Sequence, residues 1–238
     1  MLKLCIAGCL GRMGATIVDY AKETPGVYVA SGTVSKIDEK LLSNTSYSVS
    51  SVQGMSENFD VCIDFTTPNS TLAHLEKLVH INKPVVIGTT GLNEDELEII
   101  STAAKSIPVV LAPNTSLGIN MLYAAINVLT KNLPKSWDVH IEETHHIHKK
   151  DNPSGSAVKL ANIIKNNLNK NASCVGYRKG EVIGDHKITI KGQNETLTIQ
   201  HHAHDRMLFA EGAILAAQWV SDKPSGIYEM KDVLSISS

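Results

Sequence analysis

Residues 2–14 read Leu-Lys-Leu-Cys-Ile-Ala-Gly-Cys-Leu-Gly-Arg-Met-Gly, an apolar run that leads into three evenly spaced glycines. The apolar part, residues 2–7, is typical of a strand that is buried on both faces. Apolar residues at helical spacing follow from Met13 to Ala21, and this pattern stops before Pro25. Strand, glycine loop and helix in this order favour a dinucleotide-binding fold. The spacing Gly-x-x-Gly-x-x-Gly is looser than the usual Gly-x-Gly-x-x-Gly, so a tight turn that merely needs glycine is the alternative.

The rest of the first half of the chain alternates strand patterns with helix patterns. The expected strands are residues 27–34, 61–65, 84–87 and 109–111. Helices are expected to open at Thr67-Pro68 and at Asn93, where Glu96 completes a capping arrangement. Residues 36–58 are polar and weakly patterned, which favours a short helix with loops. The alternation predicts an α/β fold with a Rossmann-type, doubly wound parallel sheet.

Two polar segments directly follow strands of this sheet, Gly88-Thr89-Thr90 and Ala112-Pro113-Asn114-Thr115. Parallel sheets bind ligands at the carboxyl ends of their strands, so both segments are expected to line a cofactor cleft; plain turns are the alternative. The second strand ends at Ser35-Lys36, where NAD-preferring folds usually carry an acid for the ribose hydroxyls. Lys36 in this place predicts that NADPH is accepted at least as well as NADH, unless Lys36 is only a solvated charge.

The pattern changes after Asn114. A helix is expected over residues 117–133, and strands with two-residue alternation are expected at 138–143, 174–178, 186–191 and 196–200. They predict a second, α+β domain with a mostly antiparallel open sheet, of a kind that often pairs subunits. A helical pattern returns at residues 211–221. The expected domains are residues 1–115 with 207–238, for dinucleotide binding, and residues 116–206, for substrate binding and oligomerisation.

Residues 142–157 read Glu-Glu-Thr-His-His-Ile-His-Lys-Lys-Asp-Asn-Pro-Ser-Gly-Ser-Ala and carry most of the acid–base chemistry. A helix is expected to begin near Pro153, capped by the Asn or Asp before it. The amides of residues 154–156 would then point outward at the positive end of the helix dipole, where a carboxylate or phosphate binds. Lys149 adds a compact positive charge, and His145 and His146 exchange protons near neutral pH. This predicts a site for an acidic small molecule that is protonated or deprotonated there.

Two other interpretations of these histidines stay open. Histidines one or two residues apart are often solvated residues of a surface strand. His146 and His148 would also fall on one side of an extended segment, as metal ligands do, but no third ligand follows at a recognisable spacing. No metal is therefore expected.

Composition narrows the class of protein. The 238 residues carry a formal charge of -2, with 42% hydrophobic and 19% charged residues, a profile typical of globular proteins. We expect neither nucleic acid nor a membrane as partner, because there is no basic footprint and no apolar run of about 18 residues. The four cysteines lack a Cys-x-x-Cys pair, which favours buried free thiols in a reducing cytoplasm.

Four motifs together resemble the dihydrodipicolinate reductase family, which reduces 4-hydroxy-tetrahydrodipicolinate in bacterial lysine and diaminopimelate synthesis. They are Gly8-x-x-Gly11-Arg12-Met13-Gly14, Ile63-Asp64-Phe65-Thr66, Gly88-Thr89-Thr90-Gly91, and Glu143-x-His145-His146-x-x-Lys149-x-Asp151-x-Pro153-Ser154-Gly155-Ser156-Ala157. The resemblance runs nearly end to end, and the last motif is long and specific. It implies a two-domain reductase of a cyclic unsaturated dicarboxylate that uses NADPH or NADH. It further implies a homotetramer joined through the sheet of the second domain.

The resemblance also implies residue roles. His145 matches the family's proton donor or acceptor, Lys149 matches a proton donor, and His146, Gly155 and Ser156 match contacts to the substrate carboxylates. The implied cofactor contacts are Gly8, Cys9, Leu10, Gly11, Arg12, Met13, Lys36, Gly88, Thr89, Thr90, Ala112, Pro113, Asn114 and Thr115. The chemistry agrees, because hydride delivered to an electron-poor carbon leaves negative charge that a positioned acid must neutralise.

Three positions depart from the family pattern, and two rival functions follow from the fold. Ser156 stands where Thr is usual and keeps the hydroxyl, His140 stands where an acid is more common, and Thr115 stands where an aromatic residue is common. One rival is another dehydrogenase on the same fold, of the aspartate or homoserine type. The other is a non-catalytic NAD(P)H-sensing module, which would have no need for both His145 and Lys149.

Overall fold

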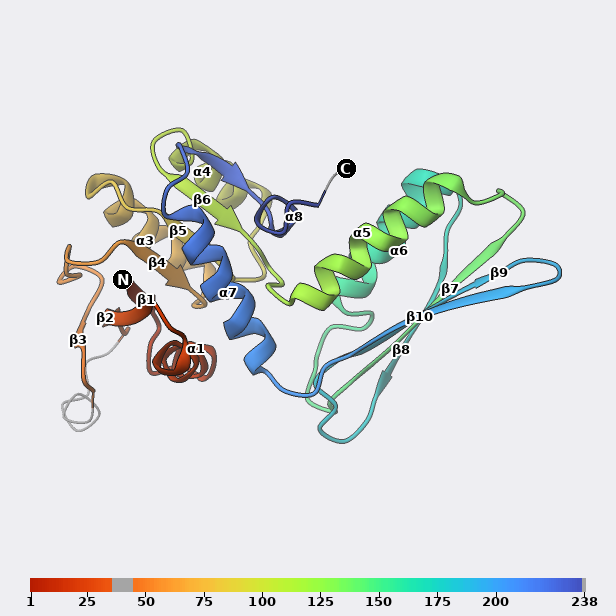
Figure 1. Ribbon diagram of the computed structural model, residues 1–238, viewed down its shortest axis with the longest axis horizontal. Coiled ribbons are helices and arrows are strands. Elements are labelled where there is room, and N and C mark those ends of the chain that lie inside the picture. The colour runs from red at the N-terminus through yellow and green to blue at the C-terminus, as the bar shows by residue number, and fades with distance from the viewer. Residues whose placement is uncertain (36–44, 237–238) are drawn as a thin grey trace. The chain divides into compact units, whose positions relative to one another are not determined.

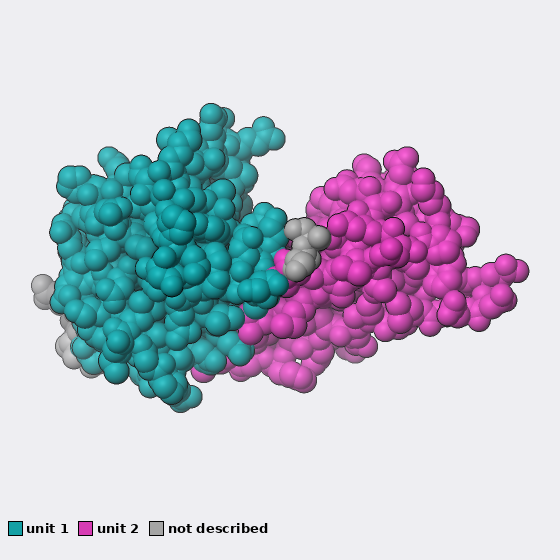
Figure 2. All heavy atoms as spheres, turned by 45° about the horizontal axis from the view of Figure 1, so that its top comes forward, with its two compact units in different colours: residues 1–115, 209–235 teal, residues 116–208, 236–238 magenta. Residues whose placement is uncertain are grey.

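The computed structural model describes residues 1–35 and 45–236, and the chain divides into two compact units. Unit 1 contains residues 1–115 and 209–235, and unit 2 consists mainly of residues 116–208 (Figure 2). The second crossing between the units lies at 208/209, in the first turn of helix α7 (Met207–Val220), two residues from the expected 206/207.

Within the described residues, unit 1 is built on seven parallel strands in the order β11-β6-β5-β4-β1-β2-β3 (Figure 1). The strands are β1 Leu2–Ala7, β2 Val27–Thr33, β3 Ser48–Ser50, β4 Val61–Asp64, β5 Val85–Ile87, β6 Pro108–Leu111 and β11 Gly226–Tyr228. The helices of this unit are α1 Arg12–Glu23, α3 Pro68–His80, α4 Glu94–Ala103, α8 Met230–Val233 and most of α7. The predicted Rossmann-type sheet is confirmed.

Local sequence signals placed most of these elements correctly. Pro68 occupies the first turn of α3, and Asn93 caps α4 with Glu96 in a reciprocal capping box, as predicted. The sequence missed β3 and β11, because neither has the continuous apolar run that reveals the equally short β5. Of the stretch predicted as a short helix with loops, residues 36–44, including Lys36, lie outside the described residues.

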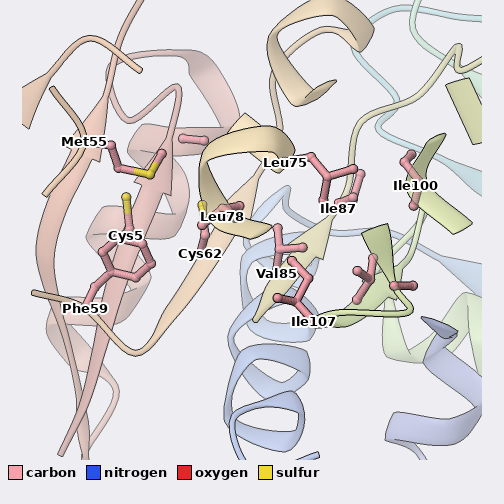
Figure 3. Close-up of a cluster of buried hydrophobic side chains, with 13 residues drawn as sticks. Cys5, Met55, Phe59, Cys62, Leu75, Leu78, Val85, Ile87, Ile100 and Ile107 are labelled. Atoms are coloured by element: carbon pink, nitrogen blue, oxygen red, sulfur yellow. The ribbon is translucent and has the colours of Figure 1, made fainter. Parts of the chain in front are cut away.

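The core of unit 1 forms where the central strands meet helices α3 and α4 (Figure 3). Leu75 and Leu78 of α3 and Ile100 of α4 are at most 1% exposed and belong to one cluster with Cys62 and Ile87 of the sheet. Cys5, Cys9 and Cys62 are buried free thiols, as expected from their place on or beside strands. Both faces of the central strands are therefore covered, which explains their nearly continuous apolar sequences.

Unit 2 pairs a four-stranded sheet with two helices. The sheet has the order β10-β9-β7-β8, with bounds β7 Asp138–His145, β8 Ser173–Arg178, β9 Asp185–Lys191 and β10 Thr196–His202. Strand β9 runs antiparallel to β7 and β10, whereas β7 and β8 are parallel, so the predicted mostly antiparallel sheet is confirmed. Helices α5 (Leu117–Asn132) and α6 (Gly155–Leu168) share one apolar cluster with β7 and β9.

Among residues 1–35 and 45–236, none of the helices combines the length and apolar character that crossing a membrane requires.

The glycine loop between β1 and α1 is held by close backbone contacts. Gly8 has a φ of 71°, in the left-handed region that favours glycine, and its carbonyl accepts from the amide of Gly11 at 2.8 Å. A Cβ at Gly14 would lie 2.1 Å from that same carbonyl oxygen and 2.8 Å from the Cα of Cys9. Because these neighbours are backbone atoms, they cannot rotate away as a side chain could.

We predict that Gly14→Ala lowers the free energy of unfolding by about 1–3 kcal/mol, the usual cost of overpacking. Helix propensity alone predicts the opposite sign, since Ala is favoured over Gly by about 1 kcal/mol within a helix. Urea denaturation measures the difference, with the exposed neighbour Ala15→Gly as the control for propensity in the same helix. A stabilised Gly14→Ala protein would contradict the crowding.

Candidate active site

Alternate residues of β7 point to the same face of the sheet, and along this face two buried apolar residues are followed by two polar ones. Val139 and Ile141 are buried in the apolar core, and the next two residues on the same face are Glu143 and His145. In the sheet register, His145 lies opposite Arg178 of β8, and Glu143 lies opposite His186 of β9. Residues far apart in the sequence thus meet at one end of the central strand.

Glu143 is the centre of this cluster. It is 0% exposed, and Nη1 of Arg178 donates to both of its carboxylate oxygens, at 3.1 and 3.2 Å. The backbone amide of Ser154 donates to Oε1 at 3.1 Å, and Oε2 pairs with Nδ1 of His145. A carboxylate without solvent needs such donors, because burying an uncompensated charge is costly.

His145 is buried between β8 and β9, with only 8% of the residue exposed. Burial lowers the pKa of His145; the hydrogen bond and charge of Glu143 oppose this, and the charges of Lys149 and Arg178 add to it. The ring is therefore neutral at pH 7. Within the part of the chain that the structure describes, Nδ1 faces the carboxylate of Glu143, which accepts hydrogen bonds, so the geometry favours a proton on Nδ1 and a lone pair on Nε2.

The start of α6 differs from the prediction. The helix begins at Gly155, two residues after Pro153, and its cap is Ser154 and not the Asn or Asp before the proline; the Ser154 hydroxyl accepts from the amide of Ala157 at 3.3 Å. The Ser154 amide, which was expected to face outward, donates to Glu143 instead. Tertiary contact with a strand residue eleven positions earlier decides this, which helix-start rules based on neighbouring residues cannot reveal.

Lys149 and Asp151 form an ion pair beside the start of α6, with Nζ of Lys149 2.9 Å from Oδ1 of Asp151. Burial raises the pKa of Asp151, but the hydrogen bond and charge of Lys149 and the amides of Asp151 and Gly155 outweigh it, so the pKa lies below its ordinary value. An internal carboxylate thus already rests against the lysine and an amide of the helix start. This agrees with the prediction that the site favours negative charge.

Arg178 fixes the loop that carries these groups. Its Nε donates to the carbonyl of Lys149 at 3.3 Å, and its Nη2 donates to the carbonyl of Asp151. The same guanidinium binds Glu143. One side chain thereby links the strand, the loop and the helix start, which suits the fixed fork of an arginine.

The other histidines divide into exposed and buried ones. His148 is exposed and its ring centroid lies 6.3 Å from that of His146, which is half-buried. Burial first, and then the charge of Arg206, lowers the pKa of His146. Within the described residues, no group of three or more His, Cys, Asp or Glu side chains is arranged to hold a metal ion.

His186 is 3% exposed and lies edge-on to His145, with ring centroids 5.2 Å apart. Its Nε2 faces the hydroxyl of Ser154 at 3.5 Å, while its Nδ1 has no hydrogen-bond partner among the described residues. Burial lowers the pKa of His186 to about 3, assisted by the charges of His145, His201 and Lys149. This ring stays neutral under all ordinary conditions.

The predicted cofactor segments of unit 1 all lie at the carboxyl ends of the strands of its sheet. Residues 8–13 follow β1, residues 88–90 follow β5, and residues 112–115 follow β6, and these strands run in parallel with β4 between β1 and β5. Helix α1 starts at Arg12 with no side-chain cap, so its first amides face the loop, as a bound pyrophosphate requires.

The side chains of two predicted cofactor contacts, Thr89 and Thr115, make hydrogen bonds within unit 1. Thr89 is 2% exposed and its hydroxyl lies 2.7 Å from that of Thr71; Thr115 is 0% exposed and its hydroxyl donates to the carbonyl of Phe209 at 2.7 Å. Their hydroxyls therefore hold strand ends in place. Short polar residues after a strand carry the same sequence signal in either role.

A buried polar network supports this edge of the sheet. Oδ1 of Asp64 accepts from the amide and the hydroxyl of Thr66, at 2.9 and 2.6 Å. Oδ2 of Asp64 lies 2.9 Å from Nδ1 of His74, and Nε2 of His74 lies 2.8 Å from the hydroxyl of Thr33. The network joins the ends of β2 and β4 through α3.

Sequence reasoning missed the roles of Glu143, Arg178 and His186. A signal existed for two of them: His186 continues the inward pattern of Ile188 and Ile190, and Arg178 continues that of Cys174. A polar residue on the apolar face of a strand is unusual enough to mark a site. Their partners, however, emerge only from the strand register.

Comparisons with known proteins match the whole chain. Two family models fit it: "Dihydrodipicolinate reductase, N-terminus" over residues 2–115 and "Dihydrodipicolinate reductase, C-terminus" over residues 118–234. A 4-hydroxy-tetrahydrodipicolinate reductase of Pelagibacter ubique is 36% identical over 254 residues, covering 98% of both chains. The enzyme of the same name from Zymomonas mobilis is 35% identical over 99% of this chain and 98% of its own length.

The fold also matches a solved structure, a dipicolinate-bound dihydrodipicolinate reductase from Paenisporosarcina sp. TG-14. The TM-score is 0.82 with 23% identity, over 96% of this chain and 97% of the other. At this identity the match supports the fold alone, which is the α/β Rossmann-type architecture with a second sheet described above.

We predict that His186 makes the fold sensitive to acid. Its folded-state pKa of about 3 lies below the ordinary 6.5, so the unfolded chain binds more protons between these values, and stability falls as pH drops below about 6.5. The expected loss from this one residue between pH 6.5 and 5 is about 2 kcal/mol. Urea unfolding at several pH values should show a shallower dependence for His186→Gln, and an unaltered one for the exposed His148→Gln. Equal slopes in the His186→Gln and wild-type proteins would contradict a buried neutral ring.

Proposed function

The chain belongs to the dihydrodipicolinate reductase family, and from this premise we propose that it reduces 4-hydroxy-tetrahydrodipicolinate to tetrahydrodipicolinate with a nicotinamide cofactor. This reaction is a step of lysine and diaminopimelate synthesis. The single observation that carries the proposal is the cluster at the end of β7, where a neutral buried His145 and a Lys149 ammonium stand beside an amide-rich helix start.

The glycine loop of unit 1 suits the cofactor. The turn after β1 admits no Cβ at Gly14, and the uncapped amides at the start of α1 are free of side-chain competition for a pyrophosphate. The proposed contacts are residues 8–13, 88–90 and 112–115, with Thr89 and Thr115 acting through the framework that they hold. The cofactor, when bound, supplies the hydride.

We assign NADPH as accepted at least as well as NADH. Support comes from the sequence after β2, where Ser35-Lys36 stands in place of the acid that binds the ribose hydroxyls of NAD.

Lys149 is the proton donor of the proposed reaction. Its ammonium is held within reach of the site by Asp151 and by the loop that Arg178 fixes. His145, neutral with its proton on Nδ1, presents the Nε2 lone pair and therefore acts as an acceptor of a hydrogen bond or proton at neutral pH. Of the two roles that the resemblance allows His145, this favours acceptor.

The substrate's carboxylates are expected at the start of α6. Lys149 offers positive charge there, His146 offers a ring nitrogen for hydrogen bonding, and the backbone of Gly155 and Ser156 offers amide donors. Asp151 occupies part of this environment in the structure, since Lys149 and the Gly155 amide favour its charged form. A substrate carboxylate must therefore compete with Asp151 for the same donors.

We further propose a cytoplasmic homotetramer joined through the sheet of unit 2. The outward face of this sheet exposes apolar side chains that a subunit contact would cover: Val175 is 46% exposed and Tyr177 50%. Free rather than disulfide-bonded cysteines suit a reducing compartment.

We predict that Lys149→Ala lowers kcat by about 100-fold or more, the usual worth of a positioned acid, with NADPH affinity almost unchanged. The assay couples the protein to a synthase that makes the substrate and follows the loss of NADPH and NADH absorbance separately. Lys150→Ala is the matched control, since this lysine is the exposed neighbour. Unchanged turnover in Lys149→Ala would remove Lys149 from the chemistry, and a wild-type protein that oxidises neither cofactor would refute the proposed function.

A further inference from the structure

The buried carboxylate of Glu143 has more donors than a structural anchor needs. Oε1 accepts from the Ser154 amide and from Arg178, each at 3.1 Å, and these two donors alone satisfy it. Oε2 accepts from Arg178 at 3.2 Å and faces Nδ1 of His145. The second oxygen is therefore the one that acts on the histidine.

The donors around Glu143 restrict its carboxylate to accepting hydrogen bonds. A backbone amide and a guanidinium only donate, so both oxygens of Glu143 must accept. The proton between Glu143 and His145 then belongs to Nδ1, and the ring is left with a lone pair on Nε2. A neutral imidazole can carry its proton on either nitrogen. A partner that fixes the proton on one nitrogen also fixes the orientation of the ring.

The residues around Nε2 of His145 do not determine whether this nitrogen carries a proton. This nitrogen lies beside Gly184, where a Cβ would be 3.0 Å away, closer than an ordinary contact. The charged and titratable groups near the ring are Glu143 on its own strand, Arg178 on β8, His186 on β9 and Lys149 on the following loop. Glu143 alone among them contacts a ring nitrogen through an acceptor.

We propose that Glu143 is a positioning residue of the active site, which fixes His145 in the tautomer with its proton on Nδ1 and thereby directs Nε2 to the substrate. The inference rests on the proposed function for the role of His145 in turnover. The tautomer itself is a property of the free protein and can be measured without substrate.

The substitution Glu143→Gln keeps the shape of the side chain and replaces one acceptor oxygen by an NH₂ donor. The Ser154 amide holds the new carboxamide oxygen at the Oε1 position, so the NH₂ group turns toward His145. Nδ1 must then accept, and the proton moves to Nε2. The same logic explains why replacing the carboxylate behind a catalytic histidine by an amide impairs serine proteases while leaving their geometry intact.

The test combines kinetics with ¹⁵N NMR of histidine-labelled full-length protein, the His145 signal being assigned by its loss in His145→Gln. At pH 7, wild-type His145 should show a protonated Nδ1 and an unprotonated Nε2, and Glu143→Gln should show the reverse. The kcat of Glu143→Gln should fall by about 100-fold or more, because a positioned acid or base contributes about 10²–10⁴-fold, with KM and NADPH affinity nearly unchanged. Glu142→Gln is the matched control, because Glu142 points to the other face and pairs with Lys187 at 3.1 Å; it should match the wild type.

Several results would overturn the proposal. A wild-type His145 protonated on Nε2 would do so without any variant, even if Glu143→Gln failed to fold. Equal kcat in the Glu143→Gln and wild-type proteins would do so as well. If the tautomers behave as expected but His145→Gln retains full activity, Glu143 orients the ring as proposed and the role of His145 in turnover is wrong. A wild-type protein without reductase activity would refute the proposed function, with the tautomer measurement still deciding whether Glu143 orients the ring.

Discussion

Successive side chains of a strand point to opposite faces of its sheet, and in β7 this places Val139, Ile141, Glu143 and His145 on the face that packs against α5 and α6. The first two anchor the strand in the core, and the last two extend that face beyond the apolar cluster. The precision of the site therefore derives from the packing of the core, since His145 cannot move without its strand.

The carboxylate of Glu143 connects His145 to the other groups of the cluster. Buried and 0% exposed, it depends on Arg178, on the Ser154 amide and on His145, and each of these groups belongs to a different element. Removing any one leaves a buried charge with fewer donors, which is expensive in a medium without water. The helix start, the loop with Lys149 and the histidine are consequently coupled through one residue.

In the function proposed above, the two units would use different parts of the chain for binding. In unit 1 the backbone would provide the binding groups, through glycines that permit close approach and through the uncapped start of α1, while side chains such as Asp64 and His74 stabilise the strand ends from within. In unit 2 side chains would provide the chemistry, and the backbone at Gly155 offers charge compensation that Asp151 already uses. The first kind of site is visible as a glycine pattern, whereas the second depends on which side chains meet.

The fold class and most of the strands and helices could be predicted from the sequence, and so could the candidate pair His145 and Lys149, because hydrophobic periodicity, capping residues and a long motif are local properties. The same patterns could not reveal that α6 begins at Gly155, that the Ser154 amide is taken, or that the hydroxyls of Thr89 and Thr115 face inward. These points, and the partnership of Glu143 with Arg178, depend on the tertiary fold. The physical reason is that strand register and helix packing bring together donors and acceptors from distant segments, and a buried group takes whichever partner the fold places beside it.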